Sequence, residues 1–196
     1  MTSYVGIDPG LDGFIARIEW KWTANQKPKP ESGQWLDSYF QPSVSLFPIP
    51  TLATGRGSKR LYDRHGLWML VQEVVKDAEL VELERQGAMP GQGVSACWSG
   101  GFGYGLLCMA LTAAKAPTEE VMPAVWKRSV GVLVPADGSD KAARKKQGKA
   151  LAIQKAQGLY PGVDLRASER SRVPSPDAAE ALLLAHYALT RTRKSE

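Results

Sequence analysis

The chain has 196 residues, of which 43% are hydrophobic, and a formal net charge of +5. This length and apolar content predict one substantial hydrophobic core, and no shift in composition marks a second domain. The two cysteines and two histidines do not form the short-spaced pairs that a zinc site needs. We expect Cys97 and Cys108 to be buried, reduced thiols in a cytoplasmic protein, since the sequence shows neither a signal peptide nor an apolar run of about 18 or more residues.

The N-terminal part of the chain has the pattern of an antiparallel sheet. Residues 5–8 form an apolar run that breaks at a Pro-Gly pair, and residues 14–22 alternate between apolar and polar side chains, which predicts a hairpin. A polar loop over residues 23–34 leads to two further predicted strands, 35–40 and 43–49, the second weakened by nearby prolines. A three-stranded antiparallel unit is therefore expected here.

Helices and strands alternate after this unit. Apolar residues recur at helical spacing over residues 63–76, and a strand is predicted over residues 80–84. A helix between these strands gives a crossover, which places the new strand parallel to its neighbour. We interpret residues 86–105 as a Gly-rich loop and residues 106–114 as the next helix.

The C-terminal half is predicted to be mainly helical. A short strand is expected over residues 119–123, followed by a basic helix that begins after Asp140 and ends near Gly158. The last helix has Ser175 as its N-cap and Pro176 at its first position. A meander followed by alternating helices and strands predicts an α/β fold, with a mixed sheet and helices on its faces.

Four carboxylates are predicted to converge at one edge of this sheet. Asp8 ends the first strand and Glu84 ends the strand at 80–84, while Asp177 and Glu180 lie one helical turn apart in the last helix. Glu82 shares the face of Glu84, and strand alternation alone does not choose between them. Buried carboxylates need compensation, and Mg²⁺ or Mn²⁺ supplies it because hard cations prefer oxygen ligands.

Positive charge is concentrated in the segment that follows Asp140. This segment has no acidic residue and contains Lys141, Arg144, Lys145, Lys146, Lys149 and Lys155. A run of charge is often only a solvated helix face. Beside a buried acidic cluster, however, it is typical of a protein that gathers phosphates on its basic surface and approaches them through cations.

With these motifs in order along the chain, the sequence resembles the RuvC family of Holliday junction resolvases, and is most similar to its phage-type branch. The motifs that carry the resemblance are residues 6–11 (GIDPGL), 83–86 (LERQ) with 89–94 (MPGQGV), 123–127 (PAVWK) with Lys141, and 177–182 (DAAEAL). Any one of these motifs is weak alone, whereas the four occur in the family's order over nearly the whole chain.

The resemblance implies an RNase H-like fold with a mixed five-stranded sheet flanked by helices, in a single domain over residues 1–190 with a basic tail at 191–196. It implies a homodimer in the cytoplasm of a bacterial or phage-infected cell, which cleaves four-way DNA junctions symmetrically with two Mg²⁺ or Mn²⁺ ions per site and no nucleotide cofactor. The implied catalytic residues are the metal ligands Asp8, Glu84, Asp177 and Glu180, with Lys127 and Lys141 near the cleaved phosphate.

Candidate DNA contacts follow from the same motifs and from the basic segments. They are Arg56, Lys59, Arg60, Arg85, Met89, Gln92, Arg144, Lys145, Lys146 and Lys149. The chain departs from the family in one respect, because bacterial members carry an aromatic residue shortly after the second-motif glutamate that stacks on junction bases. This chain has Gly87-Ala88-Met89 there, and Met89 could fill part of that role.

Several residues have a structural interpretation beside the functional one. Asp12 with Gly13 fits a hairpin turn better than a catalytic site. Asp177 could serve only the helix dipole, and Glu180 could be a solvated helix residue. His186 lies within an apolar helix, where a hydrogen-bonded structural role is preferred to metal ligation.

Three alternative functions remain open from the sequence. An ATPase of the actin and sugar-kinase class shares an Asp-Gly turn after its first strand, but needs a second phosphate loop and more chain. A non-catalytic junction-binding protein would rely on the basic helix alone. A different RNase H-like nuclease could act on branched DNA or on RNA–DNA hybrids, because loops and dimer arrangement, rather than the fold, select the substrate shape.

Overall fold

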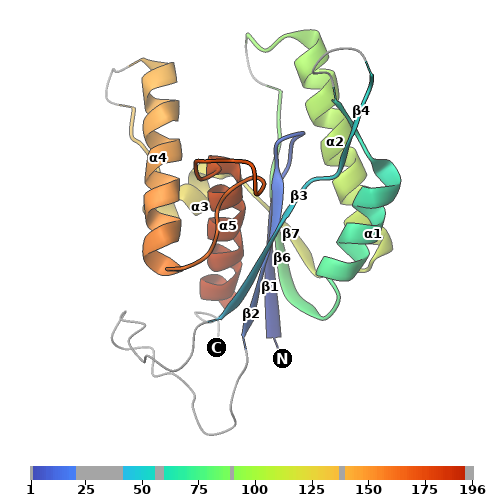
Figure 1. Ribbon diagram of the computed structural model, residues 1–196, viewed down its shortest axis with the longest axis horizontal. Coiled ribbons are helices and arrows are strands. Elements are labelled where there is room, and N and C mark those ends of the chain that lie inside the picture. Colours follow the sequence, from blue (N-terminus) through green and yellow to red (C-terminus); the bar gives the residue numbers. More distant parts are fainter. Residues whose placement is uncertain (1, 21–41, 56–59, 89–90, 137–139, 193–196) are drawn as a thin grey trace, which may run out of the picture.

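The computed structural model describes residues 2–20, 42–55, 60–88, 91–136 and 140–192, and its centre is a five-stranded sheet between two layers of helices (Figure 1). The strands of this sheet are β1 (Thr2–Asp8), β2 (Phe14–Trp20), β3 (Ser43–Pro48), β6 (Ala78–Glu84) and β7 (Thr118–Val121). Their spatial order is β3-β2-β1-β6-β7. The predicted mixed five-stranded sheet is confirmed.

The sheet combines an antiparallel and a parallel half. β1 pairs antiparallel with β2, and β2 pairs antiparallel with β3, as the predicted meander requires. β6 pairs parallel with both β1 and β7. β3 is the edge strand, where its proline costs no ladder hydrogen bond inside the sheet. The strand predicted over residues 35–40 lies outside the described residues.

One face of the sheet is covered by α1 (Arg64–Val74) and α2 (Val94–Ala113). Asp63 caps α1, since its Oδ1 accepts a hydrogen bond from the Gly66 amide at 2.9 Å. The apolar core of this layer is formed by the residues of β1, β2 and β6 that face α1 and α2, together with the buried residues of these two helices. This layer lies away from the four carboxylates.

The other face carries α3 (Pro123–Ser129), α4 (Lys141–Leu159) and α5 (Pro176–Thr192). α5 lies directly on β1, at a position where the strand has Gly6. A Cβ at Gly6 would lie 2.2 Å from the Ala185 amide nitrogen, so only glycine allows this approach. Ala181, Ala185 and Ala188 of α5 are fully buried. Small residues on both elements therefore bring the start of α5 to the sheet.

The predicted caps of the last two helices are confirmed. The Asp140 carboxylate accepts from the first amides of α4, and the Ser175 hydroxyl accepts from the Ala178 amide at 3.3 Å. α5 extends through Thr192, so Arg191 belongs to this helix and not to the basic tail assigned from the sequence.

Two local predictions were wrong, and one small hairpin was not predicted. α2 begins at Val94, inside the segment interpreted as a Gly-rich loop, despite the low helix propensity of its glycines, and all its buried residues lie at Gly103 or beyond. Residues Thr51–Ala53 and Arg60–Tyr62 pair as a small hairpin, β4 and β5, which the sequence did not indicate. Pro123 starts the short helix α3 instead of ending a strand, and proline at the first helical position is the signal that was overlooked.

α2 also changes two expectations drawn from composition. Within the described residues, it is one helix that is long and apolar enough to cross a membrane by length and composition alone, although the sequence was expected to contain no such segment. α2 buries Leu107 and Leu111 against the sheet layer, but only 22% of its apolar stretch is buried inside the structure. Both cysteines lie on α2 as free thiols, and they are half-buried where full burial was expected.

Candidate active site

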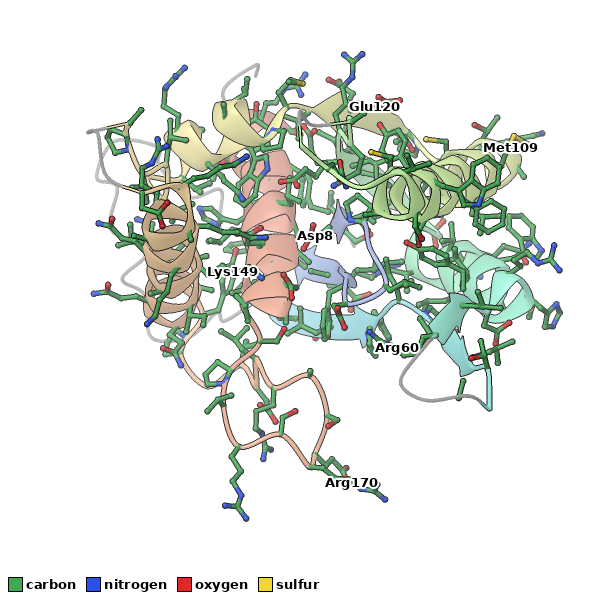
Figure 2. The ribbon with its side chains drawn as sticks, turned by 90° about the horizontal axis from the view of Figure 1, so that it is seen from above. Asp8, Arg60, Met109, Glu120, Lys149 and Arg170 are labelled. Carbon is green, nitrogen blue, oxygen red and sulfur yellow. The ribbon has the colours of Figure 1, made fainter. Side chains whose placement is uncertain are left out.

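Two neighbouring parallel strands bring Asp8 and Glu84 to the same edge of the sheet. The register pairs Ile7 with Leu83, so that the next residue on each strand is a carboxylate. The first two turns of α5 add Asp177 and Glu180 from above this edge. The four carboxylates line one open cavity of about 620 Å³, and Figure 2 shows Asp8 in the space between α5 and α2.

Burial and mutual repulsion shape the electrostatics of this cavity. Asp8 is 8% exposed and Glu84 is 7% exposed. Burial raises the pKa of Asp8 well above its ordinary value, and the charges of Glu84, Glu180 and Asp177 raise it further. Burial also raises the pKa of Glu84, against the opposing effects of Lys127 and Trp126. The charged forms of Asp8 and Glu84 are therefore disfavoured in the protein alone, and a bound cation would stabilise them.

Glu84 is oriented by a tryptophan that the sequence analysis did not single out as a site residue. Trp126 of α3 is fully buried, and its Nε1 donates a hydrogen bond to Glu84 Oε2 at 2.8 Å. This bond fixes one oxygen of the carboxylate. The position of Trp126 directly before Lys127, in the third motif, was the available signal.

Two lysines reach the carboxylates that α5 contributes. Lys127 Nζ lies 3.0 Å from Glu180 Oε2 and 5.1 Å from the centroid of the Trp126 ring. Lys149 Nζ, from α4, lies 3.0 Å from Asp177 Oδ1. Burial alone would lower the pKa of Lys149, but the hydrogen bond and charge of Asp177 raise it above its ordinary value. Lys149 was predicted only as a DNA contact, yet it contacts a predicted metal ligand.

The donor set fits a hard divalent cation in its chemistry, because carboxylate oxygens are the ligands that Mg²⁺ and Mn²⁺ prefer. Among the residues that the structure describes, however, no group of three or more Asp, Glu, His or Cys side chains is arranged to hold a metal ion. Asp177 and Glu180 are instead held by lysines. The residues that would hold cations are Asp8, Glu84, Asp177 and Glu180. Binding through the last two would require Lys149 to leave Asp177 and Lys127 to leave Glu180.

The wall of the cavity opposite the sheet edge is basic. Lys141, Arg144 and Lys145 of α4 line it together with Lys149, whereas Lys146 is exposed on α4 outside the lining. Lys141 therefore lines the same cavity as the four carboxylates, and its place near the cleaved phosphate stays a prediction. Most of the basic residues predicted for this helix therefore lie on one side of the four carboxylates.

The other predicted DNA contacts are more scattered. Arg60 forms an ion pair with Asp12 at the mouth of the cavity, Arg85 directly follows Glu84, and Gln92 is exposed before α2. Arg56, Lys59 and Met89 lie outside the described residues. The structure thus places Arg60 and Arg85 close to the site and leaves the remaining contacts as predictions.

Glu82 has a partner of its own and does not line the cavity. This side chain is fully buried, and Arg191 Nη1 donates to its Oε1 at 2.8 Å, while the same guanidinium also pairs with Glu119. Burial raises the pKa of Glu82 to about 7, against the lowering effect of Arg191. The choice of Glu84 over Glu82 as the cavity-lining residue agrees with this arrangement.

Asp12 and His186 are the two residues for which the structural interpretation was preferred, and both take part in local hydrogen bonding or ion pairing, although Asp12 also lines the cavity. Asp12 lies in the turn between β1 and β2, which the Gly13 amide closes by donating to the Gly10 carbonyl at 3.1 Å. His186 Nδ1 lies 2.8 Å from the Tyr160 hydroxyl, on the helix side of the fold. His186 is thus a hydrogen-bonded residue of the packed layer and does not line the cavity.

No protein-family model and no curated protein matches the sequence. Among solved structures, the chain is similar to RuvC of Thermus thermophilus, with 14% identity and a TM-score of 0.51 over 98% of this chain and 96% of that one. It is also similar to the T. thermophilus RuvC structure in complex with a Holliday junction substrate, with 14% identity, the same coverage of both chains and a TM-score of 0.56. The chain therefore has a RuvC-like α/β fold of the RNase H-like type.

Proposed function

We propose that this protein is a divalent-metal-dependent endonuclease that resolves four-way DNA junctions, and that it belongs with the phage-type branch of the RuvC family. One observation carries the proposal: four carboxylates from β1, β6 and α5 line a single cavity whose opposite wall is the basic helix α4. Acidic and basic walls facing each other match a substrate that is itself a phosphate chain, approached through cations. The RuvC-like fold supports the same assignment.

Asp8, Glu84, Asp177 and Glu180 would hold two Mg²⁺ or Mn²⁺ ions in this proposal. Bound cations would supply an activated water for in-line attack on phosphorus and would stabilise the leaving 3′ oxygen. The chain's own residues do the remaining work. Trp126 holds Glu84 in a fixed orientation, and Lys127 and Lys141 offer positive charge to the phosphoryl oxygens.

The choice of a four-way junction as substrate is supported by the RuvC structure that contains a Holliday junction. The basic wall of α4 provides attraction to any DNA, because phosphate contacts carry no sequence information. Branched DNA needs in addition two equivalent sites at a fixed distance, which a two-fold symmetric dimer provides.

A homodimer is therefore part of the proposal, and α2 is the surface that we assign to it. The outer side of this helix exposes Val94 at 87%, Trp98 at 75% and Met109 at 66%, and Met109 points away from the sheet (Figure 2). Gly101 and Gly105 on the same helix have open space around them, which lets another helix approach closely. Exposed apolar stripes of this kind mark interaction surfaces. Sedimentation of a stable monomer, both alone and on junction DNA, would contradict the dimer.

The proposal is tested by incubating the protein with Mg²⁺ and a panel of labelled four-way junction, fork, duplex and RNA–DNA hybrid. We expect paired, symmetric nicks in the junction, loss of cleavage in EDTA, and little cutting of duplex. Preferred cleavage of the hybrid would instead favour a different RNase H-like nuclease. Tight junction binding without cleavage in Mg²⁺ or Mn²⁺ would indicate a non-catalytic junction-binding protein.

A further inference from the structure

The two lysines at the candidate site hold their carboxylates in different ways. Lys127 is held twice, by Glu180 and by the face of the Trp126 ring. Lys149 makes its ion pair with Asp177 alone, and it extends to that carboxylate from the helix on the opposite wall of the cavity. Figure 2 shows Lys149 on the α4 and α5 side of the space that contains Asp8.

The Lys149–Asp177 pair is not needed to hold the fold together. The side chains of Lys149 and Asp177 are 36% and 25% exposed, and ion pairs with this access to water contribute little to stability. α4 and α5 already pack through apolar residues, with Ala152 and Ala156 fully buried between them. The Lys149–Asp177 ion pair can therefore be replaced by another contact. The charge that Lys149 brings to the cavity matters more than the stability that the pair adds to the fold.

The charge of Lys149 reaches the whole acidic cluster. Without a cation, Asp8, Glu84, Asp177 and Glu180 repel one another in a partly buried cavity, and a lysine ammonium is one of the few groups that can reduce that repulsion. An ammonium and a divalent cation compete for the same carboxylate oxygens. A cation ligated through Asp177 Oδ1 must displace Lys149, which then remains on the basic wall beside Arg144 and Lys145.

We propose that Lys149 is the resident counter-ion of Asp177, which occupies this carboxylate in the metal-free protein and sets the affinity of the site for divalent cations. The inference deepens the proposed function, on which it rests, by naming a residue that regulates metal loading at the same site. Lys149 is a positioning residue in this role, because it acts through Asp177.

The chain offers a matched control in Lys145. Lys145 lies one turn earlier on α4 and lines the same cavity, but it makes no ion pair with any residue that the structure describes. Removing either lysine takes one positive charge from the same wall. Only removal of Lys149 also frees Asp177.

The test is Mn²⁺ binding without DNA, measured from the electron paramagnetic resonance signal of free Mn²⁺. We expect Lys149→Gln to bind Mn²⁺ about fivefold or more tightly than the wild type, which is a typical size for coupling between two ligands of one site. Lys145→Gln should change the affinity by less than about twofold. Lys149→Arg, which keeps the charge, should bind Mn²⁺ about as the wild type does.

A second readout separates competition from misfolding. In EDTA, Lys149→Gln should unfold at a lower temperature than Lys145→Gln, and saturating Mn²⁺ should remove that difference. Equal Mn²⁺ affinity in Lys149→Gln and Lys145→Gln would overturn the inference and leave the proposed function standing. Absence of Mn²⁺ binding in the wild type and in all variants would overturn both.

Discussion

Two glutamates on one strand, two residues apart, have opposite surroundings. Glu82 is fully buried and is paired with Arg191, a residue of the last turn of α5 whose guanidinium also binds Glu119. Glu84 is buried as well, but its fixed partner is the neutral Trp126 indole, and it lines the cavity beside Asp8. The same residue type on the same strand face therefore has a permanently charged partner in one place and a neutral hydrogen-bond donor in the other.

The difference shows how the fold separates a structural carboxylate from one available for chemistry. A guanidinium keeps its positive charge at all ordinary pH values, so it is available to Glu82 whenever that carboxyl group is ionised. An indole N–H orients a carboxylate and leaves its charge for another ligand. Burial of a carboxylate is therefore no sign of function in this chain, whereas the lack of a permanent cationic partner is.

The contrast between Glu82 and Glu84 is tested most strongly by replacing each glutamate separately with glutamine. Glu84→Gln, like Asp8→Asn, should lower Mg²⁺-dependent junction cleavage by about a thousandfold or more, because two-metal catalysis depends on the ligand charge. Glu82→Gln should cleave within about tenfold of the wild type. The measurement is a single-turnover gel assay, with junction binding measured in parallel and expected to persist in all three variants. Near-normal cleavage by Glu84→Gln would remove Glu84 from the site.

A second prediction uses the pH dependence of stability. Burial raises the pKa of Glu82 from 4.5 to about 7, so the folded protein keeps a proton that the unfolded chain releases first. The free energy of unfolding should therefore fall as pH rises from about 4.5 to about 7, by up to about 3 kcal/mol from this group. Glu82→Gln should lack that share of the fall.

Denaturant unfolding in EDTA at pH 5 and pH 8 would measure this effect. Asp8 and Glu84 also have raised pKa values and should contribute a fall of the same sign. Mg²⁺ should cancel the contribution of Asp8 and Glu84 at pH 8 but leave that of Glu82. Identical pH profiles for wild type and Glu82→Gln would show that Glu82 does not titrate in this range.

The partner of Glu82 provides a third test. Arg191→Met should lower the free energy of unfolding at pH 8 by about 2 kcal/mol, less than for a fully buried pair because Glu82 can take up a proton instead. Arg166→Met, which removes an exposed ion pair with Asp164, is the control and should leave the free energy of unfolding nearly unchanged, because water screens that pair. Equal effects from both variants would mean that the Glu82 cluster is not a structural element.

A fourth prediction separates the roles of two lysines that line the cavity, Lys127 and Lys145. Lys127→Ala should lower the single-turnover cleavage rate by about tenfold at saturating enzyme, because its charge acts as the transition state develops. Lys145→Ala should instead weaken binding to any DNA and reduce the slope of log affinity against log salt by about one. Normal cleavage by Lys127→Ala with a reduced salt slope would make Lys127 a phosphate anchor.

The smallest effect is expected at Trp126. Trp126→Phe keeps a large aromatic side chain but removes the N–H that donates to Glu84. Loss of one such bond costs about 1 kcal/mol, so cleavage should slow by about fivefold at limiting Mg²⁺ and recover at high Mg²⁺. A rate unaffected by this substitution at all Mg²⁺ concentrations would show that Glu84 needs no orientation from Trp126.

Much of the sheet could be predicted because its signals are local. Alternation in β2 and the apolar runs of β1 and β6 define strands, and the helix caps Asp63, Asp140 and Ser175 are read directly from the sequence. α2 could not be placed well, since its glycines have low helix propensity and its buried residues all lie at Gly103 or beyond.

The site was predictable to the extent that strand ends and one helical turn bring residues together. Asp8, Glu84, Asp177 and Glu180 line one cavity for this reason. Ion pairs between a helix and an element far away in the sequence could not be predicted. The Arg191–Glu82 pair and the Lys149–Asp177 pair depend on how α5 and α4 lie on the sheet, and no local pattern encodes that placement.

Crystals soaked in Mn²⁺ and measured for anomalous scattering test the central claim most directly, because they locate the cation without relying on activity. The account predicts anomalous peaks among Asp8, Glu84, Asp177 and Glu180, with Lys149 displaced from Asp177, and no peak beside Glu82. Peaks at the Glu82–Glu119–Arg191 cluster, or an empty carboxylate cavity at saturating Mn²⁺, would contradict it.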